Sequence, residues 1–331
     1  MSVLGASSPI PYQEEKVPIR DLGEKFTEGS FSMRLRHLRY FLAVAEEQSF
    51  IRAAAKVHIE PSPLSRAIRE LETALDVRLL HRARGSVKLT WAGEVFLEEA
   101  RRMLALMDAA RLRVASAAKG FRGHLRIGLA DSLAHPRLTT LLARCREEEP
   151  LTEVRIIEMP FSEMIKALGH DQIDAGFTVH SELSDKFIKK VAWTDRPAIA
   201  VPKNHPLLSL EKISLQEIVQ HSLVLYHPER CFSGYDIIHR WFRERALPMP
   251  SVVEYVSGHE LMMTLVAAGY GVGFALESQV KLYHHPDIVV RPVTDDVPSA
   301  VTFLTMLDKP YSEELSRFIT RTQRVGEVDT S

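Results

Sequence analysis

The chain of 331 residues is too long for one ordinary small domain and suits two or three, and its 45% hydrophobic content is normal for a globular protein with a core. Its net charge of −1 is unevenly spread: residues 34–90 carry eleven Lys/Arg against six Asp/Glu, and this +5 segment beside a remainder of −6 indicates that one part binds a polyanion. The two cysteines, Cys145 and Cys231, are far apart, which excludes a disulfide scaffold and a zinc finger. The sequence has no apolar run of about eighteen residues, which excludes a membrane-spanning protein. With no secretory signal, these features predict a cytoplasmic location.

The first segment, residues 1–32, contains three prolines and scattered Gly and Ser without any periodicity. We interpret it as a mobile N-terminal extension. An upstream start codon, with Met33 as the functional beginning, is an equal alternative. At the other end, residues 326–331 are expected to form a tail.

Three helices are predicted next, at 35–47, 50–57 and 61–75. The third has an apolar stripe at helical spacing, formed by Leu64, Ile68, Leu71 and Leu75. Its other side carries short hydroxyls and long cations, and the candidate DNA-binding residues there are Ser62, Pro63, Ser65, Arg66 and Arg69. Such a helix packs its back on a small core and places its front in a phosphate-lined groove.

The segment 79–90 has apolar residues on either side of a basic, glycine-containing turn, which predicts a β-hairpin wing. Arg82, Arg84 and Lys88 lie on or beside this wing, within reach of a phosphate backbone. Further candidate backbone contacts, from the first two helices and their start, are Arg34, Arg36 and Arg52. Residues 33–91 are therefore predicted to form an all-α winged helix-turn-helix DNA-binding domain.

A long helix is predicted from 91 to 119, where no proline occurs. Its apolar residues are spaced alternately by four and three, which indicates a heptad-like seam that pairs with a second copy. The candidate dimerisation residues are Phe96, Met103, Met107, Ala110 and Val114. The alternative is an amphipathic helix packed on its own chain. We treat 92–120 as a linker and dimerisation helix.

After Gly120 and Gly123 the pattern changes to alternating strands and helices, which predicts an α/β domain with mostly parallel sheets covered on both faces. Strands are expected at 125–129, 154–158, 174–179, 198–201, 223–226, 252–256, 272–276, 289–293 and 301–306, and helices at 138–147, 163–168, 237–245, 260–268 and 312–324. Two such series suggest two Rossmann-like lobes within residues 121–325: lobe 1 at 121–196 and 294–325, and lobe 2 at 197–293. Ligands of open α/β sheets bind at the carboxyl ends of the strands.

Together these features resemble the LysR-type bacterial transcriptional regulators over about residues 33–325. The resemblance rests on Leu38-Arg39-Tyr40-Phe41, Ser49-Phe50 with Ala53-Ala54, the segment 64–72 (LSRAIRELE), and Leu89-Thr90 with Gly93; weaker marks are 173–177 and 265–269. It implies a winged helix-turn-helix, a dimerising linker helix and an effector domain of the type II periplasmic-binding-protein kind. It also implies a tetramer that binds promoter DNA and a small-molecule effector, with activation or repression and RNA polymerase contact left open.

Within this family, the segments 36–41 and 46–50 are similar to those of regulators of aromatic-compound degradation, several of which bind muconate-like dicarboxylates. Two effector-site positions stand against transferring that ligand. Where those relatives have a threonine and an arginine, this chain has Phe161 and Val179. The expected effector is therefore only an organic acid or aromatic-derived metabolite, with no further cofactor. A separate departure concerns DNA: the polar pair that usually precedes the recognition helix is replaced by Glu60-Pro61, so base contacts are expected to depend more on the serines and arginines of that helix.

Candidate effector-binding residues follow predicted strands, where ligands bind. Ser132 and Leu133 match the first effector-binding loop of the family, and Phe232 and Ser233 match a loop of the second lobe. The remaining candidates are Phe161, Thr178, His180 and Arg230. Ser132 as a simple N-cap, and His180 and Arg230 as ordinary surface residues, are the alternatives.

Other functions have weaker support. A redox-responsive regulator would need a low thiol pKa at Cys231, for which His227 and Arg230 are the nearby candidates. No G-x-S-x-G elbow occurs, and 259–263 begins like a zinc protease motif but lacks the second histidine, so we predict neither catalytic nor metal-binding residues. A small-molecule binding protein without DNA function is the alternative from another class, and the +5 segment argues against it.

Overall fold

The computed structural model describes residues 33–83, 86–131, 135–280, 285–294 and 297–327. The chain divides into two compact units, Met1–Arg101 and Arg102–Ser331. The extension predicted at 1–32 lies outside the described residues, as does the tail beyond 327. Residues 326 and 327 belong to the last helix instead of the predicted tail.

The first unit begins with three helices: α1 (Leu35–Glu47), α2 (Phe50–Lys56) and α3 (Pro61–Leu75). Local chemistry fixes their starts, because the Ser49 hydroxyl accepts the Arg52 N–H at 3.4 Å and Pro61 occupies the first turn of α3. The stripe predicted on α3 forms the core, in which Leu64, Ile68 and Leu71 are fully buried.

The wing follows as an antiparallel hairpin of β1 (Leu80–Ala83) and β2 (Ser86–Leu89), with Leu80 opposite Leu89. The long helix α4 (Trp91–Ala118) begins directly after Thr90, whose hydroxyl accepts the Gly93 N–H at 2.9 Å. No helix in the described part of the chain combines the length and the apolar composition needed to cross a membrane.

The second unit contains two five-stranded sheets, one in each lobe. Lobe 1 has the order β4-β3-β5-β12-β6, formed by β3 (Gly123–Ala130), β4 (Thr152–Met159), β5 (Ala175–Thr178), β6 (Phe187–Asp195) and β12 (Ala300–Leu307). Lobe 2 has the order β11-β7-β10-β8-β9, formed by β7 (Pro197–Pro202), β8 (Leu223–Tyr226), β9 (Val252–Val256), β10 (Val272–Leu276) and β11 (Ile288–Pro292). The chain crosses between the lobes after β6 and again after β11.

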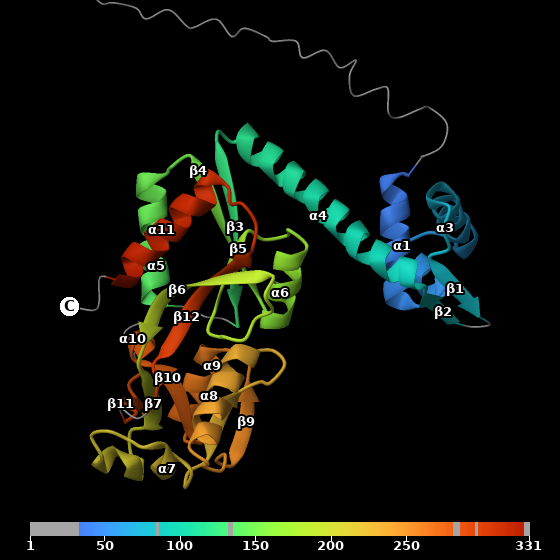
Figure 1. Ribbon diagram of the computed structural model, residues 1–331. Coiled ribbons are helices and arrows are strands. Elements are labelled where there is room, and N and C mark those ends of the chain that lie inside the picture. Colours follow the sequence, from blue (N-terminus) through green and yellow to red (C-terminus); the bar gives the residue numbers. More distant parts are fainter. Residues whose placement is uncertain (1–32, 84–85, 132–134, 281–284, 295–296, 328–331) are drawn as a thin grey trace, which may run out of the picture. The chain divides into compact units, whose positions relative to one another are not determined.

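Helices cover both faces of each sheet, as predicted. In lobe 1, α5 (Pro136–Glu148) and α11 (Glu313–Glu327) lie on one face and α6 (Phe161–Gly169) on the other (Figure 1). In lobe 2, α8 (Phe232–Glu244) and α9 (His259–Ala267) contribute to separate core clusters. The shorter helices of this lobe are η2 (Pro206–Ser209), α7 (Leu215–Ile218) and α10 (Glu277–Val280).

One prediction about the sheets was wrong, and one strand was missed. The sheets are mixed, because the crossing strands β12 and β7 run antiparallel to both of their neighbours. Strand β6 was not predicted, and its register explains why. Thr302 pairs with Trp193 but Phe303 pairs with Val191, so Ala192 is an extra residue that interrupts the two-residue alternation.

Candidate functional site

The helix α3 presents the face that was predicted to bind DNA. Pro63, Arg66 and Arg69 are exposed, as is Ser62, and Ser65 is half-buried. The neighbouring Arg78 and His81 were not singled out from the sequence, yet they line one groove together with Arg69 and Arg82. Glu72 is the acidic group among the described lining residues, so the groove has a net positive charge from its three arginines, and a phosphate backbone can be contacted there.

Glu72 of α3 holds the wing. One carboxylate oxygen accepts the N–H groups of Leu79 and Leu80 at 2.9 and 3.2 Å, and the other pairs with Arg82 at 3.1 Å. Arg82 also donates to the Ser65 hydroxyl at 3.4 Å, and its guanidinium lies 5.2 Å from the centre of the Phe50 ring. Arg82, predicted as a phosphate contact, therefore makes its described contacts within the domain and joins the wing to α3.

The other residues predicted to contact the DNA backbone differ in their surroundings. Arg34, Arg36 and Lys88 are exposed. Arg52 is exposed too, but its guanidinium is 3.6 Å from the Glu47 carboxylate. Arg84 lies outside the described residues.

The predicted dimerisation residues on α4 separate into two groups. Phe96 is half-buried and packs on Phe41 of its own domain, with ring centres 5.1 Å apart, so its described ring contact lies within the first unit. Met103 is 37% exposed and Val114 71% exposed, Ala110 is exposed and Met107 is half-buried. An apolar surface is therefore present on α4 without Phe96.

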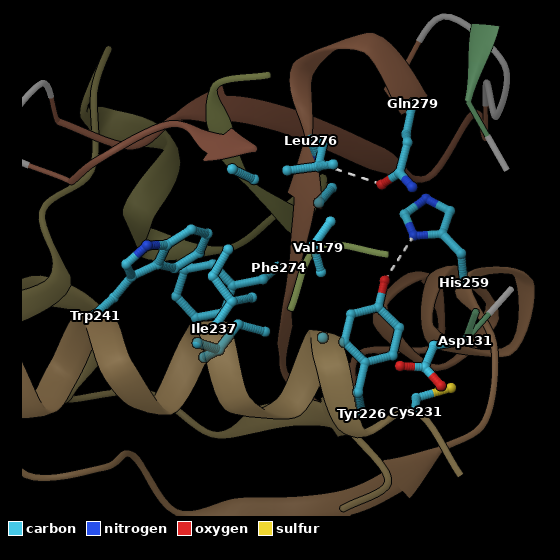
Figure 2. A pocket seen from close by; sticks show the side chains of 14 residues that line it. Asp131, Val179, Tyr226, Cys231, Ile237, Trp241, His259, Phe274, Leu276 and Gln279 are labelled. Carbon is cyan, nitrogen blue, oxygen red and sulfur yellow. Dashed lines mark hydrogen bonds between the residues drawn. The ribbon is translucent and has the colours of Figure 1, made fainter. Parts of the chain in front are cut away.

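In the second unit, a pocket with an empty volume of about 610 Å³, including its open mouth, lies where the lobes meet. Its described walls come from both lobes, with Asp131, Val179 and Ala300 from lobe 1 and the other lining residues from lobe 2. Figure 2 shows Asp131 and His259 at one end and Trp241 with Ile237 at the other. The pocket is thus polar at one end and apolar at the other.

Asp131 is the acidic residue at the polar end. It follows β3 in the left-handed conformation (φ 54°) and connects the starts of two helices. One of its carboxylate oxygens accepts the Phe161 N–H of α6 at 3.0 Å, and the other accepts the Ser233 N–H of α8 at 2.7 Å. Burial raises the pKa of Asp131, against the lowering effect of the hydrogen bonds from Ser233 and Phe161.

Five of the predicted effector-binding residues meet beside this pocket, at the contact between the lobes. The Thr178 and Ser233 hydroxyls are 3.2 Å apart and both residues are buried. The His180 ring lies 4.6 Å from that of Phe161 and 5.2 Å from that of Phe232. None of the five is a described lining residue of the pocket, because these side chains pack on one another across the lobes.

The remaining predicted effector-binding residues are Ser132, Leu133 and Arg230. Ser132 and Leu133 lie outside the described residues. Arg230 is exposed and is not among the described lining residues, so it does not replace the missing cation there. The polar lining residues that were missed are Asp131, Tyr226, His259 and Gln279. Asp131 could have been found, since it lies two residues after the predicted strand 125–129.

Burial keeps two other lining groups uncharged at neutral pH. It lowers the pKa of His259 to about 4 and, together with the charges of Asp131 and Glu158, raises the pKa of Cys231 to about 12. The Cys231 thiol donates to the Ser257 carbonyl at 2.9 Å. The redox alternative is therefore disfavoured, because a reactive cysteine needs a lowered thiol pKa.

A serine, a histidine and an aspartate meet where the chain crosses between the lobes, but their wiring is not that of a hydrolase. His135 Nε2 is 2.9 Å from both Asp195 and the Ser278 hydroxyl, and His135 Nδ1 accepts the Arg137 N–H at 3.1 Å. In the neutral ring the proton is then on Nε2, which cannot take one from Ser278. Within the described residues, no cluster of His, Cys, Asp or Glu could hold a metal ion.

Known protein families match both parts of the chain. The family described as bacterial regulatory helix-turn-helix protein, lysR family, matches residues 35–94, and the LysR substrate binding domain matches residues 118–326. The HTH-type transcriptional regulator BenM of Acinetobacter baylyi is 33% identical over 280 residues, covering 82% of this chain and 88% of BenM. AlsR of Bacillus subtilis, another HTH-type transcriptional regulator, is 32% identical over 254 residues, covering 76% of this chain and 83% of AlsR.

Solved structures show the same architecture. The LysR family regulator CbnR has a TM-score of 0.65 at 24% identity, covering 89% of this chain and all of CbnR, and this likeness concerns the fold. Full-length BenM has a TM-score of 0.57 at 28% identity, covering 88% of this chain and 96% of that structure. The chain therefore belongs to the LysR family of DNA-binding transcriptional regulators, with a helix-turn-helix domain followed by an effector-binding domain.

Proposed function

We propose that this regulator changes its activity at a promoter when a small molecule binds in the pocket between the lobes. The observation that carries the proposal is that the described pocket walls come from both lobes. A ligand that contacts Asp131 on one side and Tyr226 on the other favours one arrangement of the lobes. Only such a difference in affinity between two conformations allows a ligand to shift an equilibrium.

DNA recognition is assigned to α3 in the major groove. Arg66 and Arg69 are exposed on this helix, and an arginine can form two hydrogen bonds to a guanine edge. Lys88 of the wing, with Arg34 and Arg36 at the domain start, supplies phosphate contacts. Binding to promoter DNA requires access to the chromosome, so the proposed location of the protein is the cytoplasm.

Self-association is assigned to α4. Its exposed apolar residues Met103, Leu106 and Val114 suit a helix pair between two copies. Two copies place two recognition helices on one duplex, and further association of dimers gives the proposed tetramer. RNA polymerase is the further partner in this proposal, because regulation acts at a promoter.

The proposal is tested by titrating salt against binding of the full chain to duplex DNA from its own promoter region. Phosphate contacts predict a steep loss of affinity with salt. The variant Arg69→Ala should weaken specific binding by about 1–3 kcal/mol and non-specific binding less. Arg146→Ala, which removes one exposed charge from α5, is the matched control and should change neither. Undetectable binding at low salt would refute the proposed DNA function and favour a binding protein without it.

A further inference from the structure

Resting on the proposed function of the interlobe pocket, we propose that its ligand is a small apolar molecule with a hydrogen-bond-donating head, preferably an ammonium, and that the pocket rejects carboxylates. Asp131 receives this head. The organic acid expected from the sequence is thereby replaced by the opposite charge class.

The charge of the pocket walls disfavours an anionic ligand. The polar groups among the described lining residues are Asp131, Tyr226, Cys231, His259 and Gln279, and no Lys or Arg occurs among them. Burial keeps His259 neutral by lowering its pKa to about 4. A ligand carboxylate would thus lose its hydration without gaining a cationic partner in these walls, and it would face the negative charge of Asp131.

Asp131 already occupies the place where an anion would bind. The starts of α6 and α8 both point backbone N–H groups at its carboxylate, at 3.0 and 2.7 Å. Helix N-termini attract anions, and here the anion is part of the chain. A free carboxylate would have to displace a tethered one, whose effective concentration is much higher.

Asp131 can still accept a ligand. A carboxylate has about four acceptor positions. The N–H groups of Phe161 and Ser233 take two, and the Ser233 side chain also bonds to it. Capacity for one more donor is left on the side where Asp131 lines the pocket. An ammonium is the strongest donor for this position, because its hydrogen bond to a carboxylate is charge-assisted.

The other end of the pocket defines the body of the ligand. Trp241 and Phe274 are only 3% and 2% exposed, and Ile237 lies beside them (Figure 2). Flat or compact apolar groups bury their surface well against such side chains. An aromatic ring joined by a short chain to the donor spans the two ends.

The test uses three molecules of similar size that differ in the head: 2-phenylethylamine, 2-phenylethanol and phenylacetate. Binding to the full chain is measured by calorimetry and by thermal shift. We expect the amine to bind at least about tenfold tighter than the acid, with the alcohol between them, because a charge-assisted hydrogen bond is worth at least that factor. Tightest binding by the acid, or binding of none of the three, would overturn the proposal.

The variant Asp131→Asn tests the role of the carboxylate. It should reduce the preference for the amine over the alcohol to about twofold or less, whereas Asp185→Asn, at an exposed position of lobe 1, should leave it unchanged. Unchanged amine binding by D131N would refute the role of Asp131. If D131N fails to fold, the order of the three molecules on the unaltered protein still decides.

Failure of this inference is distinguishable from failure of the proposed function. DNA affinity of the same preparation is measured with and without the amine. Binding in the predicted order without any effect on DNA affinity would support the ligand class and overturn the effector role of the pocket. Regulation of DNA binding by the acid alone would support the effector role and overturn the ligand class.

Discussion

Replacing Glu72 with alanine should loosen the wing of the first unit and leave the effector domain unchanged. The Glu72 side chain is 14% exposed, and its carboxylate accepts the N–H groups of Leu79 and Leu80 and the guanidinium of Arg82. Leu79 and Leu80 are 1% and 3% exposed, so their N–H groups have little access to water as a substitute acceptor. The substitution therefore leaves two backbone donors without their described partner.

The expected magnitude follows from these contacts. A hydrogen bond to a charged group contributes about 1.5–3 kcal/mol, and the three contacts are not additive, so we expect a loss of about 3 kcal/mol in local stability. Glu72→Gln keeps one carbonyl acceptor and should lose about half as much. Arg82→Ala keeps the Glu72 contacts to both backbone N–H groups. It removes the partly exposed ion pair, the 3.4 Å hydrogen bond to Ser65 and the contact with the Phe50 ring, and it should cost about 1 kcal/mol.

Native-state hydrogen exchange measures the effect directly. A loss of about 3 kcal/mol increases the exchange of the Leu79 and Leu80 amides about 100-fold if they exchange by opening of the wing. Amides of α9 in the effector domain are the internal control and should keep their rates. Less than about a threefold change at Leu79 and Leu80 in E72A would contradict the assignment of Glu72 as the residue that holds the wing.

Three further predictions concern single residues. Burial lowers the pKa of His259 to about 4, so between pH 6.5 and pH 4 the unfolded chain binds a proton that the folded protein does not. The free energy of unfolding should therefore fall by ~3 kcal/mol as the pH drops from 6.5 to 4. His259→Gln should remove that part of the pH dependence, as measured by urea titrations. Gly93→Ala should destabilise the first unit by about 3 kcal/mol in denaturant melts, since the added Cβ would lie 2.1 Å from the Leu79 carbonyl oxygen. In the control Gly169→Ala the nearest atom is 4.0 Å from the added Cβ, and stability should change by no more than about 0.5 kcal/mol. Equal effects of the two substitutions would show that the close approach at Gly93 does not matter. The Cys231 thiol, with its pKa raised to about 12, should resist iodoacetamide at pH 8 in the folded protein and react in urea, and rapid labelling of the native protein would revive the redox alternative.

The helices of the first unit were predictable because their determinants are local. The predicted bounds 35–47 and 61–75 agree with α1 and α3, and 50–57 exceeds α2 by one residue. An apolar stripe, a hydroxyl N-cap and a proline in the first turn act within a few residues of one another. The exposed arginines of α3 follow from the same periodicity, since they lie opposite the buried leucines.

The strands of the effector domain were less predictable where pairing depends on distant segments. The alternation of β6 is interrupted at Ala192 by its pairing with β12, which lies more than a hundred residues later in the chain. The antiparallel direction of β7 and β12 results from the two crossings between lobes, which a local pattern of strands and helices does not encode.

For the effector site, the sequence by itself brought Phe161, Thr178, His180, Phe232 and Ser233 into one region, through strand ends and family resemblance. Only the tertiary structure decided that these side chains contact one another across the lobes while the pocket beside them has other walls. Likewise, the residue type of Asp131 was visible, but its acceptance of N–H groups from α6 and α8 depends on the closed packing of two lobes. Periodicity and capping are properties of short segments, whereas the charge of a pocket is set by groups that meet only after the chain has folded.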